Sequence, residues 1–76
     1  MYYMESLLIE VFKTDIKRYA KAGQVIQLLS NRFPGCRISI DLEDCDKVLR
    51  IEGYNFLPCH IIELLQARGY YCAILQ

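Results

Sequence analysis

The spacing of apolar residues constrains the fold of this chain more than any other feature of its sequence. Four short stretches are rich in apolar residues, with clean alternation in the second of them, which predicts strands at residues 6–13, 36–42, 48–52 and 70–75. Only residues 43–47 separate the second strand from the third. Because so short a connection joins neighbouring antiparallel strands, we expect these two strands to form a hairpin.

Two further stretches have apolar residues three and four positions apart, the spacing of an amphipathic helix. The first helix must end before Pro34, because the residue before a proline is disfavoured in a helix. We expect Asn55 to cap the second helix, with Pro58 in its first turn and Gly69 directly after its end. The apolar stripes are Ala22, Val25, Ile26, Leu29 and Phe33 in the first helix, and Ile61, Ile62, Leu64 and Leu65 in the second.

The resulting order is strand, helix, strand, strand, helix, strand. This order predicts an α+β fold of the ferredoxin-like βαββαβ type, a four-stranded antiparallel sheet with two helices on one face. The chain has 76 residues, so one such domain accounts for nearly all of it. We expect an apolar N-terminal tail at residues 1–5 and a single domain at residues 6–76.

Composition and charge exclude several classes of function. Nine Lys and Arg balance nine Asp and Glu, whereas nucleic-acid-binding domains and peripheral membrane anchors normally carry a basic excess. The third predicted strand also lacks the aromatic residues on which RNA-recognition domains stack bases. An apolar content of 54% argues for a packed core rather than disorder. We therefore predict neither a nucleic-acid partner nor a membrane association.

The four cysteines, at positions 36, 45, 59 and 72, include no Cys-x-x-Cys pair of the kind common in zinc sites. No secretory segment precedes them, so we interpret the protein as cytoplasmic with reduced cysteines. Free cysteine behaves mainly as a small apolar residue, which makes packing the simpler interpretation. The alternatives are a metal site at Cys36, Cys59 and His60, which the topology places at one end of the sandwich, and a hard-cation site in the acidic turn at residues 43–46.

Several motifs, in the right order, resemble the heavy-metal-associated domains of copper chaperones and P-type ATPases. The stretch from Ile61 to Tyr70 resembles the second-helix signature of that family, with its acidic residue between apolar pairs and its final Gly-Tyr. Phe33-Pro34-Gly35, followed by Ile38-Ser39-Ile40-Asp41-Leu42, is similar to the family's first helix exit and second strand. The resemblance implies the ferredoxin-like fold and extends from about Ser6 to Leu75.

The chain departs from this family at its metal site. The resemblance implies two metal-binding cysteines near Arg18 and Lys21, or near Tyr19 and Ala22, and neither pair of positions holds a cysteine. Soft thiolates are the ligands that select Cu(I), and basic side chains repel a cation. Tyr70 matches the aromatic residue that shields the metal in the bacterial members. We therefore expect no resident cofactor, with weak contact to a heavy-metal ion as the exception.

The open face of the predicted sheet is the remaining candidate site. We predict a contact face formed by Leu8, Phe12, Tyr71 and Leu75, with Ala73 beside them. The tail at residues 1–4 is a candidate cover for this face, or part of a dimer contact.

The sequence therefore favours a small non-enzymatic binding module that acts through a protein partner, self-association or weak metal contact. No nucleophile with a paired base is evident. The alternative is a metal-handling protein that uses Cys36, Cys59 and His60, or cysteines supplied by a partner. A ligand-sensing regulatory domain on the same sandwich is a third class.

Overall fold

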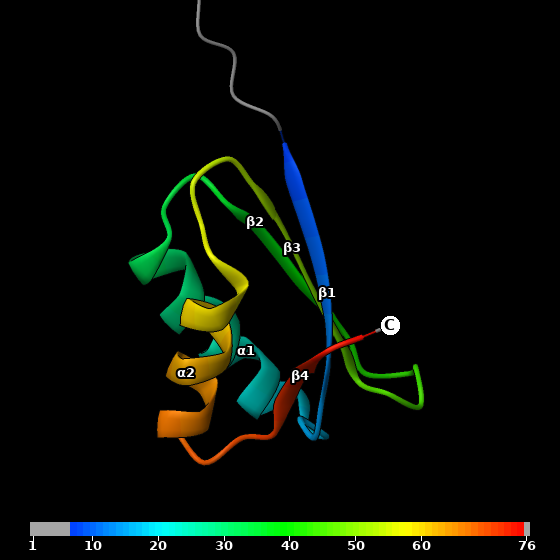
Figure 1. Cartoon of the computed structure of the whole chain (residues 1–76). Helices are drawn as coiled ribbons and strands as arrows, with labels where there is room; N and C mark the ends of the chain where they lie inside the picture. The colour runs from blue at the N-terminus through cyan, green and yellow to red at the C-terminus, as the bar shows by residue number, and fades with distance from the viewer. Residues whose placement is uncertain (1–6, 76) are drawn as a thin grey trace, which may run out of the picture.

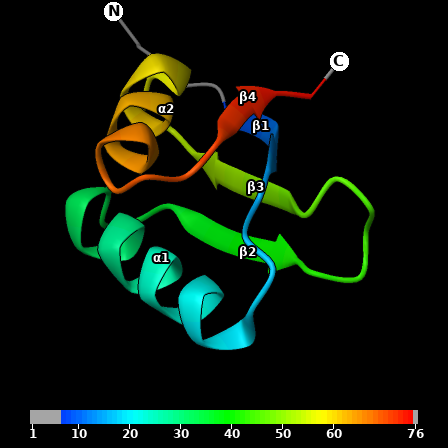
Figure 2. The same cartoon turned by 90° about the horizontal axis from the view of Figure 1, so that it is seen from below.

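The computed structural model describes residues 7–75 and shows one four-stranded sheet with two helices packed against it (Figure 1). The elements in chain order are β1 (Leu8–Thr14), α1 (Tyr19–Arg32), β2 (Arg37–Asp41), β3 (Val48–Gly53), α2 (Pro58–Ala67) and β4 (Cys72–Ile74). The strand order is β2-β3-β1-β4 and every neighbouring pair is antiparallel. Both helices lie on one side of the sheet (Figure 2). The predicted α+β fold with four antiparallel strands and two helices is confirmed, whereas the predicted tail at residues 1–5 lies outside the described residues.

Both helices begin without a capping side chain. Arg18 is the N-cap of α1 and Leu57 that of α2, and neither side chain accepts a hydrogen bond from the helix. The prediction that Asn55 caps the second helix is wrong, because the helix begins later. Pro58 occupies the first turn as predicted, since its fixed φ suits a helix start and its missing N–H has no partner there.

The helix ends follow the sequence signals closely. The first helix stops two residues before Pro34, as predicted. Gly69 follows the second helix with a φ of 88°, a left-handed conformation that favours glycine. The amide of Gly69 donates to the carbonyl of Gln66, and the amide of Tyr70 donates to the carbonyl of Leu65, both at 3.0 Å. These two bonds form a Schellman motif that turns the chain toward β4.

One cluster of buried side chains fills the space between the sheet and the helices. Its members are Phe12, Ile16, Ala22, Val25, Leu29, Leu49, Ile51, Phe56, Ile61, Leu65 and Cys72. Complete burial of one large apolar side chain stabilises a fold by about 1.5–3 kcal/mol, so this cluster is the main source of stability. Neither helix of the described chain has the length and apolar content needed to cross a membrane.

Strand β1 has the opposite orientation from the one that the sequence predicted. Phe12 is fully buried against the helices, so its predicted place on the open face is wrong. By the alternation of side chains along a strand, Leu8 shares this inner side, and it is 40% exposed near the start of the strand. Leu7 and Ile9, each 48% exposed, therefore lie on the open face instead. Both sides of this strand are apolar apart from Glu10, so the sequence alone does not say which side is the inner one.

Thr14 ties the end of β1 to the β2–β3 hairpin. It is 7% exposed, its amide donates to the carbonyl of Asp46 at 3.0 Å, and its hydroxyl donates to the carbonyl of Lys47 at 2.7 Å. The same hydroxyl accepts a bond from the amide of Ile16 at 3.2 Å. Because every polar group of this buried side chain has a partner, the start of the β1–α1 loop is fixed in place.

Candidate functional site

The four positions at which the sequence resemblance implies a metal loop lie at the start of α1. Arg18 precedes the helix, Tyr19 is 76% exposed, and Lys21 is exposed. Ala22 is the only one of the four that is buried, at 6% exposure, and it packs in the core. This part of the structure therefore offers two cations and a phenol where a soft metal ion would need two thiolates.

Tyr70 and Lys21 line the same small cavity, which has a volume of about 200 Å³. The other lining residues are Gln24, Val25, Leu28 and Arg68. Tyr70 therefore lies close to one of the four positions named above, Lys21. With two basic side chains and no acidic one in its lining, this cavity does not suit a metal cation.

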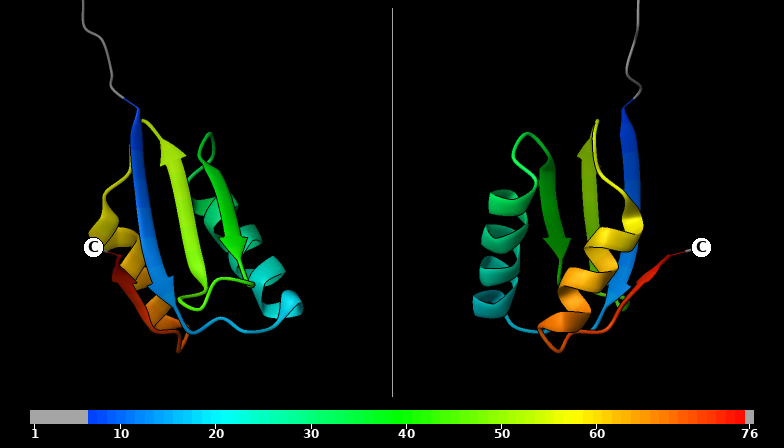
Figure 3. Two further views of the ribbon diagram at one scale, coloured as in Figure 1. Left: turned by 90° about the vertical axis from the view of Figure 1, so that its right-hand side faces the viewer. Right: turned by 60° about the vertical axis from the view of Figure 1, so that its left-hand side comes forward.

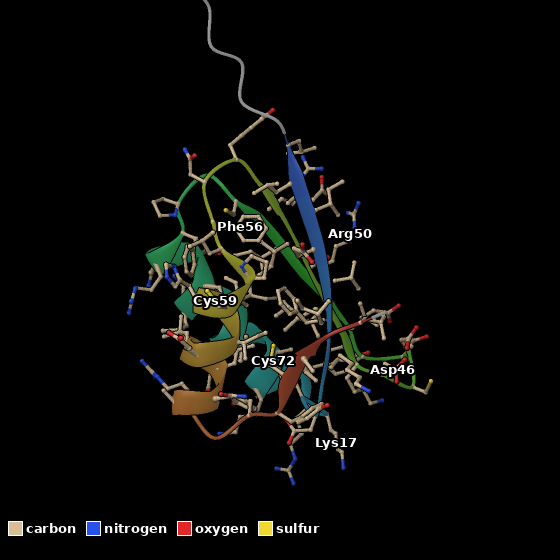
Figure 4. All side chains as sticks on the ribbon, viewed as in Figure 1. Lys17, Asp46, Arg50, Phe56, Cys59 and Cys72 are labelled. Carbon is tan, nitrogen blue, oxygen red and sulfur yellow. The ribbon has the colours of Figure 1, made fainter. Side chains whose placement is uncertain are left out.

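The alternative metal ligands Cys36, Cys59 and His60 do not form a cluster. Within residues 7–75, only Asp44, Cys45 and Asp46 bring three potential metal-ligand atoms within 4.8 Å of one another. Cys59 and His60 are both exposed on α2, and Figure 4 shows Cys59 on this helix, away from the sheet. Although the topology places these three residues at the same end of the sandwich, their side chains do not come close enough together to bind one metal ion.

Cys36 is a packing residue at the edge of the core. The pairing of Arg37 with Glu52 places Cys36 opposite Gly53 on the adjacent strand. A Cβ atom added to Gly53 would lie 2.4 Å from the Cys36 sulfur, so the thiol occupies the space that the glycine leaves free. Burial also raises the pKa of the Cys36 thiol, and it raises the pKa of Cys72 to about 11. Raised pKa values keep these thiols protonated, the opposite of what a nucleophile or a metal ligand requires.

The cluster of Asp44, Cys45 and Asp46 belongs to the turn between β2 and β3. One carboxylate oxygen of Asp44 accepts a hydrogen bond from the amide of Asp46 at 2.8 Å, which closes a local turn. The ammonium group of Lys47 donates to the carbonyl of Leu42 at 2.7 Å and brings a positive charge into the same turn. These contacts account for the acidic residues as turn-forming groups.

The open face of the sheet combines an apolar half with a charged half. The apolar half contains Ile9 and Val11 of β1 and Leu7, which directly precedes this strand. Strand β4 adds Ala73. By the same alternation Tyr71, at 52% exposure, and Leu75 keep their predicted places on this face.

On the charged half, Arg50 of β3 points away from the helices and forms an ion pair with Glu52 (Figure 4). Arg37 and Asp41 of β2 lie exposed on the same face. Because Glu52 is opposite Ile9 and Arg50 is opposite Val11, the ion pair borders the apolar half without adding net charge.

Strand β1 extends well beyond β4 and has an uncovered edge (Figure 3). The β4 pairing covers only Phe12–Thr14, and one further bond joins the amide of Leu75 to the carbonyl of Val11 at 2.9 Å. In an antiparallel strand, the amide and carbonyl of alternate residues point to the same side. Since the Val11 carbonyl faces β4, the backbone groups of Leu7 and Ile9 face that side too, where no other strand of the described chain meets them.

The sequence contained a signal for this edge that the predicted contact face did not use. Leu7, Leu8 and Ile9 are three successive apolar residues without a charge or a proline, the residues that normally protect an exposed edge. The prediction missed Leu7 and Ile9 because it placed the other side of this strand outward and did not fix the register of β4, which pairs with Phe12–Thr14.

Comparisons of the chain with protein-family models, with curated proteins and with solved structures give no match.

Proposed function

We propose that this chain is a small non-enzymatic protein-binding module that receives an extended apolar segment of a partner at the uncovered edge of β1. The observation that carries this proposal is the run of Leu7, Leu8 and Ile9, which are 48%, 40% and 48% exposed beside unpaired backbone groups. Strand addition takes its affinity from main-chain hydrogen bonds and its specificity from alternate side chains. This edge offers both the unpaired backbone groups and the alternating exposed side chains that strand addition uses.

The absence of protective residues at this edge supports the proposal. Exposed edge strands usually carry a lysine, a proline or a bulge that prevents pairing with another chain. Lys13 of β1 lies in the part that β4 covers, opposite Ala73, rather than at the open part. An apolar, uncharged edge next to a neutralised ion pair suits an apolar segment better than a charged ligand.

We also propose a more specific fold type for this domain and a relationship to a known family. We infer that the sandwich is of the ferredoxin-like type, because the central strands are β1 and β3 and the chain order is βαββαβ. We also infer that it is a relative of the heavy-metal-associated domains without their thiolate loop. The position of Tyr70 beside Lys21, where the resemblance places an aromatic residue next to the metal loop, supports this inference.

Nuclear magnetic resonance with a short strand-forming probe tests the proposed function. The probe is a capped six-residue peptide of alternating Val and Thr, added to dilute, reduced protein. We expect the amide resonances of Leu7 and Ile9 to shift most, because their N–H groups face the open edge. Changes confined to the cavity at Lys21 and Arg68, or no changes, would contradict the proposal.

A matched pair of variants at one position identifies the backbone as the binding element. Ile9→Pro removes an N–H that points away from β3, so the pairing inside the sheet is retained. Ile9→Ala shortens the side chain but keeps this N–H. We expect Ile9→Pro to weaken probe binding at least about tenfold more than Ile9→Ala does, since it removes the hydrogen bond as well. Equal binding by the two variants would exclude strand addition.

A further inference from the structure

We propose that the partner at this edge is a second copy of the same chain, whose β1 pairs antiparallel with this β1 around a two-fold axis. This inference rests on the proposed function, because it uses the same uncovered edge and names its occupant. Pairing in this way joins the two sheets into one continuous sheet and places both open faces on the same side.

The backbone of this edge is complementary to itself. Leu7 and Ile9 both direct their amide and carbonyl groups outward, whereas Leu8 directs its own toward β3. A two-fold axis at Leu8 therefore places Leu7 opposite Ile9 of the second copy, and the reverse. Each of these pairs exchanges two hydrogen bonds, and no outward backbone group between Leu7 and Ile9 remains unpaired.

The side chains at this edge favour the same arrangement. Leu7 and Ile9 of the two copies meet on the open face, and the two Leu8 side chains meet on the other face. A symmetric contact brings identical residues together, so any charge here would face a like charge. The exposed run Leu7-Leu8-Ile9 has no charge, and the nearest ionic groups on the open face, Arg50 and Glu52, already neutralise each other.

The size of this contact predicts its strength. Three residues from each copy form a small interface, below the 1,200–2,000 Å² or so of stable complexes. We therefore expect a reversible dimer with a dissociation constant in the micromolar range or weaker. At this strength the monomer is populated in dilute solution, which makes the equilibrium measurable.

Sedimentation of the reduced full chain over a wide range of concentrations tests the dimer. The wild type is expected to change from monomer to dimer as its concentration rises. Ile9→Lys is expected to raise the dissociation constant of the dimer at least about tenfold. It removes an apolar contact and places a charged side chain opposite Leu7 in both Leu7–Ile9 pairs. Tyr19→Lys is the matched control, since Tyr19 is 76% exposed at the start of α1, the helix beside β2 on the other side of the sandwich from this edge (Figure 3).

A cross-link at the axis tests the register. The variant Leu8→Cys places two cysteines opposite each other in a pair without hydrogen bonds, where the Cα atoms are about 4.5 Å apart and can form a disulfide. Exposed Cys45 and Cys59 are replaced by serine in this variant so that they cannot cross-link. Oxidation is expected to give a covalent dimer that is sensitive to reductant, whereas Tyr19→Cys in the same background stays monomeric.

The failures of the two proposals can be told apart. A wild type that stays monomeric at every concentration, or an Ile9→Lys variant that dimerises as well as the wild type, would overturn the two-fold dimer. Binding of the Val-Thr probe at Leu7 and Ile9 in such a monomer would still support the proposed function. Loss of both the dimer and the probe binding would overturn both.

Discussion

Substitution of Gly53 by alanine is expected to destabilise the fold, although the backbone there accepts any residue. Gly53 does not have a positive φ, so a Gly→Ala change would by itself stabilise the protein by about 0.4–1 kcal/mol through the unfolded state. The new Cβ, however, would lie 2.4 Å from the Cys36 sulfur, closer than real contacts allow. The sulfur must shift by roughly half an ångström or more, and such overpacking typically costs about 1–3 kcal/mol.

Thermal unfolding measures this change directly. Midway in these ranges the net loss is about 1.3 kcal/mol, and each 1 kcal/mol lowers Tm by about 4–8 °C in a domain of this size, so we expect Gly53→Ala to lower Tm by about 5–10 °C. Gly23→Ala is the matched control, because Gly23 lies exposed in α1 and an added Cβ has nothing within 4 Å. It is expected to raise the stability by about 0.5–1 kcal/mol.

A double-mutant cycle assigns the effect to Cys36. In the variant Cys36→Ala, the nearest remaining atom to a Cβ at position 53 is the Cys36 Cβ at 3.3 Å, which a small adjustment relieves. Gly53→Ala should therefore cost at least about 1 kcal/mol less in this background than in the wild type. Additive effects, or a Gly53→Ala variant as stable as the wild type, would refute the packing role of Cys36.

Three further outcomes follow from the described contacts. Thr14→Val is expected to lower the free energy of unfolding by about 1–3 kcal/mol in urea, because it leaves the Lys47 carbonyl without its donor; an unchanged denaturation midpoint would contradict this. Burial raises the pKa of Cys72 to about 11, so the folded protein retains this proton while the unfolded thiol begins to lose its proton near pH 9. Stability should therefore fall between about pH 9 and 11, by about 2 kcal/mol relative to Cys72→Ala, and parallel curves for the two proteins would exclude this. In native protein at pH 8, a thiol-labelling reagent should modify exposed Cys45 and Cys59 rapidly and Cys72 only on unfolding, and rapid labelling of all four cysteines would show that the core is open.

The sequence was sufficient to predict the elements of this fold, because each is marked by local signals. Pro34 and Gly69 end the two helices through backbone constraints that act within a few residues. The start of the second helix was predicted less well. Asn55 is of a residue type that often caps helices, but the helix begins at Pro58, so the N-cap position falls on Leu57 instead.

The face of β1 could not be predicted from alternation, because alternation gives two sides without saying which is inner. Phe12 and Leu8 share one side, Leu7 and Ile9 the other, and both sides are apolar. Which side is the inner one depends on where the helices pack, and they pack over the side that carries Phe12. The predicted contact face therefore had half of its residues on the wrong side, although Tyr71 and Leu75 were placed correctly.

The candidate site itself depends on a property that the sequence does not display. The uncovered edge exists because β4 pairs with the end of β1, at Phe12–Thr14, and the register between two strands is decided by packing and pairing rather than by composition. In contrast, the basic character of Arg18 and Lys21, where the resemblance implies metal-binding cysteines, is visible in the sequence itself.

Hydrogen exchange at two adjacent amides tests the central claim, that the β1 edge is a self-complementary contact surface, most directly. The Ile9 amide faces the uncovered edge, whereas the Glu10 amide faces β3 and serves as an internal control. We expect the Ile9 amide to exchange rapidly in dilute protein and to become protected as the concentration rises, while the protection of Glu10 stays constant. An Ile9 amide that is unprotected at every concentration, or as protected as Glu10 in dilute protein, would contradict the claim.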